Sequence, residues 1–271
     1  MLEIKQITPS EILSNQHRLD EFLKGKLRNL VNKNYWMTEW EQIAQRFQLF
    51  KLKDLSNEEI LSYEWDKNYI DEVVEQTFLT VSKHLKFDEI KVTILPALPF
   101  PWFQNYDQAI WTNGFTNSPG NIIIAIPPQP DLDFLQYLLA HETHHASPEN
   151  PIYNLTLDTF TLEEWYKMEG TAEFFSLSLY PDKRWWKDSF TEAVEFAYWS
   201  ECKEFLKTAD DKIKGRLCFG NPKKGIPYFA GYSFALNIVS NYVKTNPVSD
   251  IRDLFFVEPS KFIESYKSEV K

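Results

Sequence analysis

The chain has 271 residues, a formal net charge of −10, a hydrophobic content of 43% and only 8 glycines. This composition supports a sizeable core and excludes the disordered and fibrous classes of protein. Because the net charge repels phosphate backbones and anionic lipid head groups, we expect neither nucleic acid nor membrane as a partner.

The sequence carries no sign of export or of membrane insertion. No stretch approaches the ~20 apolar residues of a membrane span. The N-terminus, MLEIKQITPSEIL, lacks the basic start and the apolar core of a secretory signal. Cys202 and Cys218 are too few for a disulfide framework and have no zinc-finger spacing. These features predict a cytoplasmic location.

Residues 1–85 have helical patterns. TPSE has the spacing of a capping box, with Thr8 as N-cap, and SNEE at 56–59 repeats that signal. After the second signal, apolar residues recur at three- and four-residue steps up to Val81, which predicts a helix with one buried stripe.

The pattern changes at about residue 90. IKVTILPAL at 90–98 and NIIIAI at 121–126 are short β-branched runs bounded by turn formers, and both predict strands. The segment between them is rich in turn formers and aromatics. PPQP at 127–130 should end the second strand, because proline lacks the amide that a sheet needs.

Helical patterns return from residue 131. DLDFLQYLLAHETHHA predicts a helix with Asp131 or Asp133 as N-cap, and a second helix should follow Thr161. Further helices are expected at 226–247, 249–256 and 259–270, whereas the lysine-rich segment 211–225 is interpreted as a solvated loop. The chain is therefore expected to be α+β. It divides into a helical N-terminal region, residues 1–88, and a second domain, residues 89–271, unless both form one continuous domain.

HETHH at 141–145 contains the zinc-protease pattern H-E-x-x-H. His141 and His145 are four residues apart, so on a helix they share a face and their imidazoles can converge on one ion. Glu142 projects about 100° round the helix, where it can reach a water on the metal without ligating it. Leu135, Leu138 and Leu139 precede the motif and should anchor this helix to the core. We therefore predict that Zn²⁺ is the cofactor.

A catalytic zinc needs a third protein ligand besides an open position for water. The third-histidine pattern fails, because Pro148 and Pro151 occupy the required glycine and histidine positions. A carboxylate of the helix 161–180 is the alternative. Its candidates are Glu163, Glu164, Glu169 and Glu173.

The first two of these glutamates lie in the first helical turn, where capping and the helix dipole already explain acidic residues. Glu169 and Glu173 are four apart and share a face. One of them can ligate the metal while the other accepts a hydrogen bond from a ligand histidine. The small residues Gly170, Thr171 and Ala172 should let this helix approach the histidine helix closely.

HETHH together with MEGTAEFF resembles the gluzincin metallopeptidases. The resemblance implies that Glu169 is the third ligand, with Glu173 in support, although the spacing of the aminopeptidase branch would select Glu164. Gluzincins also supply a tyrosine or histidine to the oxyanion. The resemblance therefore points to Tyr232 in AGYSFA, or to Tyr228 one turn earlier.

A broader resemblance is to the YjaZ-like (DUF2268) family of predicted zinc-dependent proteases. The segments NGFTNSPGNIIIAI, LAHETHH, MEGTAEFF and GIPYFAGYSFALNIV occur in that family's order, over roughly residues 90–245. The resemblance implies a zincin-like core, in which a small mixed sheet packs on the H-E-x-x-H helix, with additional N-terminal and C-terminal helices.

These observations predict a zinc metallopeptidase that acts on a peptide or protein substrate, with Glu142 as general base. NIIIAI could be the edge strand that pairs with the peptide, or a buried core strand. The alternative function is a catalytically inactive binding or regulatory protein that keeps the zincin fold. His144 is expected at the surface or behind the ligands, and His17 and His84 at the surface.

Overall fold

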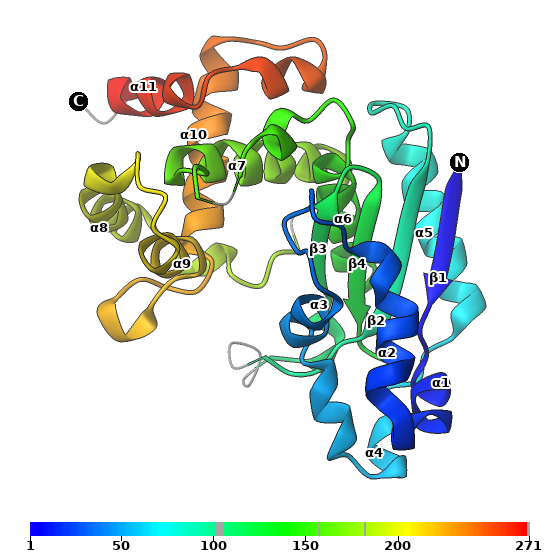
Figure 1. The fold of residues 1–271 in the computed structure, drawn as a ribbon. Coiled ribbons are helices and arrows are strands. Elements are labelled where there is room, and N and C mark those ends of the chain that lie inside the picture. The colour runs from blue at the N-terminus through cyan, green and yellow to red at the C-terminus, as the bar shows by residue number, and fades with distance from the viewer. Residues whose placement is uncertain (101–105, 157, 182, 270–271) are drawn as a thin grey trace. The chain divides into compact units, whose positions relative to one another are not determined.

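In the computed structural model, which describes residues 1–100, 106–156, 158–181 and 183–269, the chain forms two units, Met1–Pro148 and Glu149–Lys271. The first unit is a sheet covered by helices and the second is built from helices (Figure 1). The α+β class is therefore correct, while the proposed division at residue 88 stays a prediction. No helix within the described ranges is both long enough and apolar enough to span a membrane.

The elements of the first unit follow one another in a mixed order. They are β1 (Leu2–Gln6), α1 (Pro9–Ser14), α2 (Leu19–Leu27), α3 (Trp40–Arg46), α4 (Asn57–Leu61), α5 (Lys67–Val81), β2 (Ile90–Pro96), β3 (Asn113–Ser118), β4 (Asn121–Ile126) and α6 (Leu132–His145). Short 3-10 helices lie between several of them: η1 (Gln16–Arg18), η2 (Arg28–Leu30), η3 (Leu49–Lys53) and η5 (Gln108–Ile110).

The sheet has four strands in the order β1-β2-β4-β3. β1, β2 and β4 are parallel, and β3 runs antiparallel to β4, with Gly114 opposite Ile124 and Thr116 opposite Ile122. The strand NIIIAI is therefore an interior strand, and its prediction as an edge strand is wrong. The edge positions belong to β1 and β3.

Both faces of the sheet are covered, which explains the unbroken apolar runs of its central strands. Ile123 and Ala125 of β4 pack in one core cluster with residues of α1 to α4, whereas Ile122, Ile124 and Ile126 pack in another with residues of α5 and α6. Figure 1 shows these two groups of helices on opposite faces of the sheet.

Two strands were not predicted. Leu2–Gln6 was expected to belong to a helical region, and Asn113–Ser118 lies in the segment interpreted as turns. Both strands are held by pairing with a strand that comes later in the chain, rather than by a strong local pattern. Residues 101–105 of the turn-rich segment lie outside the described residues.

The predicted helix starts are largely confirmed. Thr8 caps α1, Ser56 and Glu59 form a capping box at α4, and Asp131 is the N-cap of α6. The single helix expected after Ser56 is divided, however, because Asp66 caps a new helix, α5. The predicted helix thus ends at Leu61 and starts again at Lys67.

The second unit consists of α7 (Leu162–Leu179), α8 (Glu192–Cys202), α9 (Asp211–Phe219), α10 (Ala230–Thr245) and α11 (Pro259–Glu269), with the 3-10 helices η6 (Pro151–Asn154), η7 (Lys187–Ser189), η8 (Lys203–Phe205), η9 (Pro222–Lys224) and η10 (Ile251–Phe256). The segment interpreted as a solvated loop is partly wrong, because α9 occupies its first half. Lys214 of α9 is buried and donates to the Phe160 carbonyl oxygen over 2.7 Å.

Glycines allow the helices of this unit to approach closely. A Cβ on Gly170 would lie 2.3 Å from the Ala235 carbonyl oxygen of α10, and one on Gly231 would lie 2.7 Å from the Cys218 carbonyl oxygen of α9. Neither position can take a side chain unless backbones separate. The close approach at Gly170, expected to be to the histidine helix, is made to α10.

Candidate metal centre

His141 and His145 occupy the last turn of α6, where the sequence places them on one face. Leu135, Leu139 and Ala146 hold this helix in the core cluster against the sheet, as predicted for the two leucines. Both histidines are buried, and their Nε2 atoms are 3.0 Å apart. Two nitrogens at this distance share one proton at most, so at least one of them presents its lone pair to the other.

Glu142 lies on the side of α6 that faces β3. It is buried, and the hydroxyl of Thr116 donates to its Oε2 over 2.7 Å. Gly114, two residues earlier on the same face of β3, has no side chain, and a Cβ there would lie 2.6 Å from both Cγ and Oε1 of Glu142. The carboxylate therefore lies against the backbone of Gly114 on one side and accepts a hydrogen bond from the Thr116 hydroxyl on the other.

The glutamates of α7 have different partners. Thr161 and Glu164 form the predicted capping box, and Glu163 forms an ion pair with Lys207. Capping thus accounts for Glu164, which was the alternative third ligand. Glu169 is buried further along the helix.

Glu173 is buried as well and forms a salt bridge with the buried guanidinium of Arg184, with Nη1 and Oε2 2.8 Å apart. Its predicted role, to accept a hydrogen bond from a ligand histidine, stays a prediction. The guanidinium was not anticipated, because Arg184 follows α7 in a loop with no pattern that points to the site.

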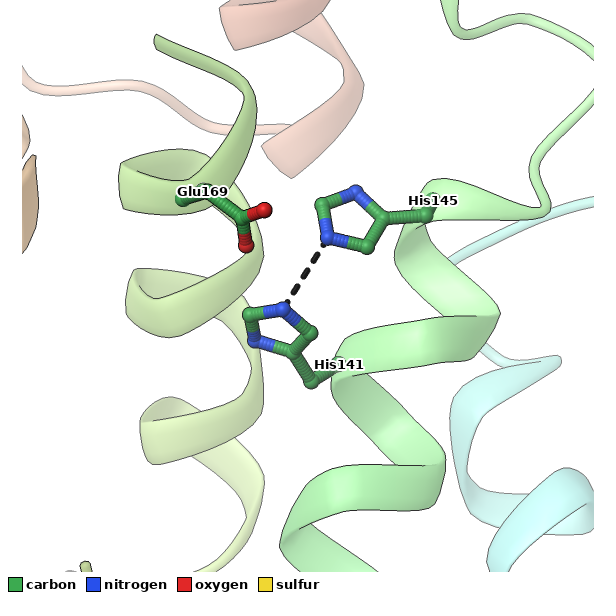
Figure 2. Close-up of side chains that lie close together, drawn as sticks. All are labelled: His141, His145 and Glu169. Carbon is green, nitrogen blue, oxygen red and sulfur yellow. Dashed lines mark hydrogen bonds between the residues drawn. The ribbon is translucent and has the colours of Figure 1, made fainter. Parts of the chain in front are cut away.

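The structure brings together three side chains that the sequence analysis selects. One ligand atom of each of His141, His145 and Glu169 lies within 4.8 Å of the others, and all three residues are buried. Figure 2 shows the carboxylate of Glu169 directed toward the two imidazole rings. Two imidazole nitrogens and one carboxylate oxygen match the donor set of catalytic zinc sites.

The spacing of the two ring nitrogens also suits zinc. Two Zn–N bonds of about 2.0–2.1 Å at a tetrahedral angle place their nitrogens about 3.3 Å apart. The observed separation is 3.0 Å, so a shift of a few tenths of an ångström would accommodate the ion. The residues present therefore fit a zinc ion.

The remaining predicted residues lie in other surroundings. His144 is fully buried, so a surface position is wrong for it, whereas His17 and His84 are exposed as expected. Tyr232 is partly buried, and its ring packs 5.0 Å from that of Trp165 and 5.2 Å from that of Phe229. Its role at the oxyanion, like that of the partly buried Tyr228, stays a prediction.

The second unit also contains a group of buried weakly acidic side chains, Tyr166, Tyr198 and Cys218. Tyr166 donates to the hydroxyl of Tyr198 over 2.7 Å, and Tyr198 donates to the Leu217 carbonyl oxygen over 2.9 Å. Burial raises the pKa of both tyrosines well above their usual range. Burial also raises the pKa of the Cys218 thiol, and the negative charge of Glu169 raises it further. A thiol held in its neutral form is not expected to act as a nucleophile or as a metal ligand.

Thr116 and Gly114 are the residues that sequence reasoning missed. They lie in NGFTNSPG, a segment interpreted as turns, although its resemblance to a family segment was noted. A period-two pattern could have paired them, since residues two apart share a face of a strand. Without the antiparallel partner β4, nothing in the segment predicts a strand.

An α+β protein with a buried His-His-Glu group is, at the level of class, a candidate metalloprotein. The chain matches the model of the family described as predicted Zn-dependent protease (DUF2268) over residues 70–264, and it belongs to that family. No curated protein and no solved structure matches the sequence.

Proposed function

We propose that this protein is a zinc-dependent peptidase with a zincin-like core, in which His141, His145 and Glu169 hold the metal. The observation that carries the proposal is the convergence of two imidazole nitrogens and one carboxylate within 4.8 Å. The description of the family as predicted Zn-dependent proteases supports the same metal and the same reaction. A peptide or protein is accordingly the proposed substrate, and a cytoplasmic location stays a prediction.

Zinc, when bound, supplies Lewis acidity that activates a water and polarises a carbonyl group. The chain supplies the proton transfer. Glu142 follows the first ligand directly in the sequence and is not one of the three grouped ligand residues. It projects about 100° round the helix from His141, and from there we infer that its carboxylate reaches a water on the metal. Its carboxylate would take a proton from the attacking water and later deliver it to the leaving amine.

Burial assists this role. Glu142 lies in a site with little access to solvent, where a fixed acceptor requires little reorganisation during the reaction. Tyr232 would donate its hydroxyl proton in a hydrogen bond to the oxyanion, and its ring contacts with Trp165 and Phe229 would fix the ring in place.

The first experiment measures metal content together with hydrolysis. We expect one equivalent of zinc in the wild-type protein and loss of that zinc in His145→Ala. Glu142→Gln should keep the zinc, because Glu142 is not a ligand, and should hydrolyse a peptide library about 10²- to 10⁴-fold more slowly.

Three results separate the alternatives. Hydrolysis by Glu142→Gln at the wild-type rate would remove the mechanism. A wild-type protein that binds zinc but cleaves no member of the library would favour a non-catalytic binding protein. Zinc content unaffected by His145→Ala would show that the metal is held elsewhere.

A further inference from the structure

The hydroxyl of Thr116 is the partner that the structure gives to the Glu142 carboxylate. Thr116 Oγ1 is 2.7 Å from Oε2 of Glu142 and 3.0 Å from the backbone oxygen of the same residue. Thr116 is 3% exposed, so water competes little for this hydroxyl proton. The contact joins residues 26 positions apart in the chain, and it therefore depends on α6 packing against β3.

The backbone oxygen of Glu142 has a hydrogen-bond donor besides the Thr116 hydroxyl. The amide of Ala146 already donates to the Glu142 backbone oxygen over 2.9 Å. Of the two hydrogen bonds that the Thr116 hydroxyl makes to Glu142, the one to the carboxylate is the shorter, and hydrogen bonds to a charged acceptor are the stronger kind.

Gly114 restricts the same carboxylate from a second direction. Gly114 and Thr116 are two residues apart on β3, so they present one face of the strand to α6. The missing side chain at Gly114 leaves the space that Cγ and Oε1 of Glu142 occupy. One oxygen of the carboxylate is fixed by a hydroxyl, and the other lies against the strand backbone.

We propose that Thr116 is a positioning residue for the general base Glu142, and that Gly114 provides the space for it; this inference rests on the proposed function. Thr116 selects the rotamer of Glu142 by donating to Oε2. Because the hydroxyl donates only one hydrogen bond to Oε2, the carboxylate keeps its remaining lone pairs for the water that it deprotonates. Without this hydrogen bond, the side chain of Glu142 would sample orientations that do not reach the water.

The test compares Thr116→Val with Thr116→Ser in the zinc-loaded, full-length protein. Valine keeps the shape of threonine but removes the hydroxyl, so kcat should fall about 10- to 100-fold, as is usual for residues that orient a metal site. KM and zinc content should stay at wild-type values. Serine restores the hydroxyl and should recover most of kcat.

Thr77→Val is the matched control. Thr77 is a buried threonine of α5 in the same unit, and its hydroxyl donates to the Val73 backbone oxygen over 2.7 Å. The same substitution there removes a buried hydroxyl without touching Glu142. It should leave kcat unchanged, which separates loss of stability from loss of positioning.

Gly114→Ala provides an independent variant. The added Cβ would meet the flexible end of Glu142 rather than a backbone, so the side chain is expected to move while the fold persists. Crystal structures of metal-free Gly114→Ala and Thr116→Val should both show the Glu142 carboxylate displaced from its wild-type position. This readout does not depend on turnover.

The outcomes distinguish the two proposals. If Glu142→Gln is inactive but Thr116→Val has wild-type kcat, or if its crystal structure shows Glu142 in place, then the role of Thr116 is wrong and the peptidase proposal stands. If Glu142→Gln hydrolyses peptides like the wild type, the peptidase mechanism itself fails. Equal loss of kcat in Thr116→Ser and Thr116→Val would also overturn the hydroxyl's role.

Discussion

Two buried glutamates, one in each unit, are held in opposite ways. Glu142 accepts a hydrogen bond from the neutral hydroxyl of Thr116 at 2.7 Å, whereas Glu173 is paired with the guanidinium of Arg184 at 2.8 Å. Glu142 is 6% exposed and Glu173 is 1% exposed, so burial alone does not separate them. The two glutamates differ in the charge of the partner, which is neutral for Glu142 and positive for Glu173.

This difference indicates what each carboxylate can do. A guanidinium favours the ionised form of the carboxylate strongly and satisfies it in a fixed geometry, which suits a structural role. A hydroxyl fixes the orientation of Glu142 and leaves the other lone pairs of its carboxylate for a water molecule, which suits the role proposed for it. The partner of a buried acid is therefore a better guide to its function than the extent of its burial.

The largest effect on stability is expected from breaking the charged pair. Arg184→Met leaves the buried Glu173 carboxylate without its guanidinium and should reduce the free energy of unfolding by about 3–5 kcal/mol. Urea unfolding followed by tryptophan fluorescence measures this loss. The double variant Arg184→Met/Glu173→Gln should recover part of it, since no buried charge remains. A loss below about 1 kcal/mol in the single variant would contradict a buried pair.

A buried acid without a cation should make stability depend on pH. Burial raises the pKa of the Cys202 thiol to about 12 from an ordinary value near 9.0. The interaction of the thiol with the Tyr166 hydroxyl acts against this rise in pKa, and the charge of Glu201 adds to the rise. The pKa values of Tyr198 and Tyr266 nearby are also raised by burial.

The raised pKa of Cys202 determines the direction in which stability changes with pH. The folded state binds protons more tightly than the unfolded state, so the stabilisation is complete below pH 9 and is lost as the pH rises toward 12. Each such group reduces stability by up to about 1.4 kcal/mol per pH unit within its window. Urea unfolding between pH 8 and pH 10.5 should show this decline, and Cys202→Ala should make it shallower. If the free energy of unfolding declined equally with pH in both proteins, Cys202 would be excluded as a source of the pH dependence.

The smallest effect is expected where the charged pair is exposed. Lys53 and Asp20 are 2.8 Å apart, as close as Arg184 and Glu173, but their side chains are 44% and 57% exposed. Asp20→Asn should therefore change the free energy of unfolding by less than about 1 kcal/mol, because solvent screens the pair. A larger loss, measured by the same urea titration, would show that proximity matters more than burial.

Local signals of the sequence were sufficient for much of the fold. The N-caps Thr8, Ser56, Asp131 and Thr161 were predictable because each side chain accepts a hydrogen bond from the amide three residues later. The two imidazoles of α6 were predictable for the same reason, since helical spacing alone places them together. Features that depend on distant partners were not: β1 and β3 exist as strands because of β2 and β4.

The residues of the candidate site also separate into those that local sequence signals predict and those that depend on distant partners. Residue types and spacing selected His141, His145 and Glu142, and a family resemblance was needed to choose Glu169 among four glutamates. The partners Thr116 and Arg184 could not be predicted, because strand pairing and loop conformation determine where their side chains point. Sequence thus identifies the proposed ligands and the proposed general base more readily than the residues that contact them.

Gly170 gives the site an unusual sensitivity to mutation. It directly follows Glu169, and the backbone of α10 occupies the space that any side chain at this position would need. Even alanine would force α7 away from α10 and carry the neighbouring carboxylate with it. We therefore expect that adding one methyl group at a residue outside the proposed ligand set would disturb the proposed metal site.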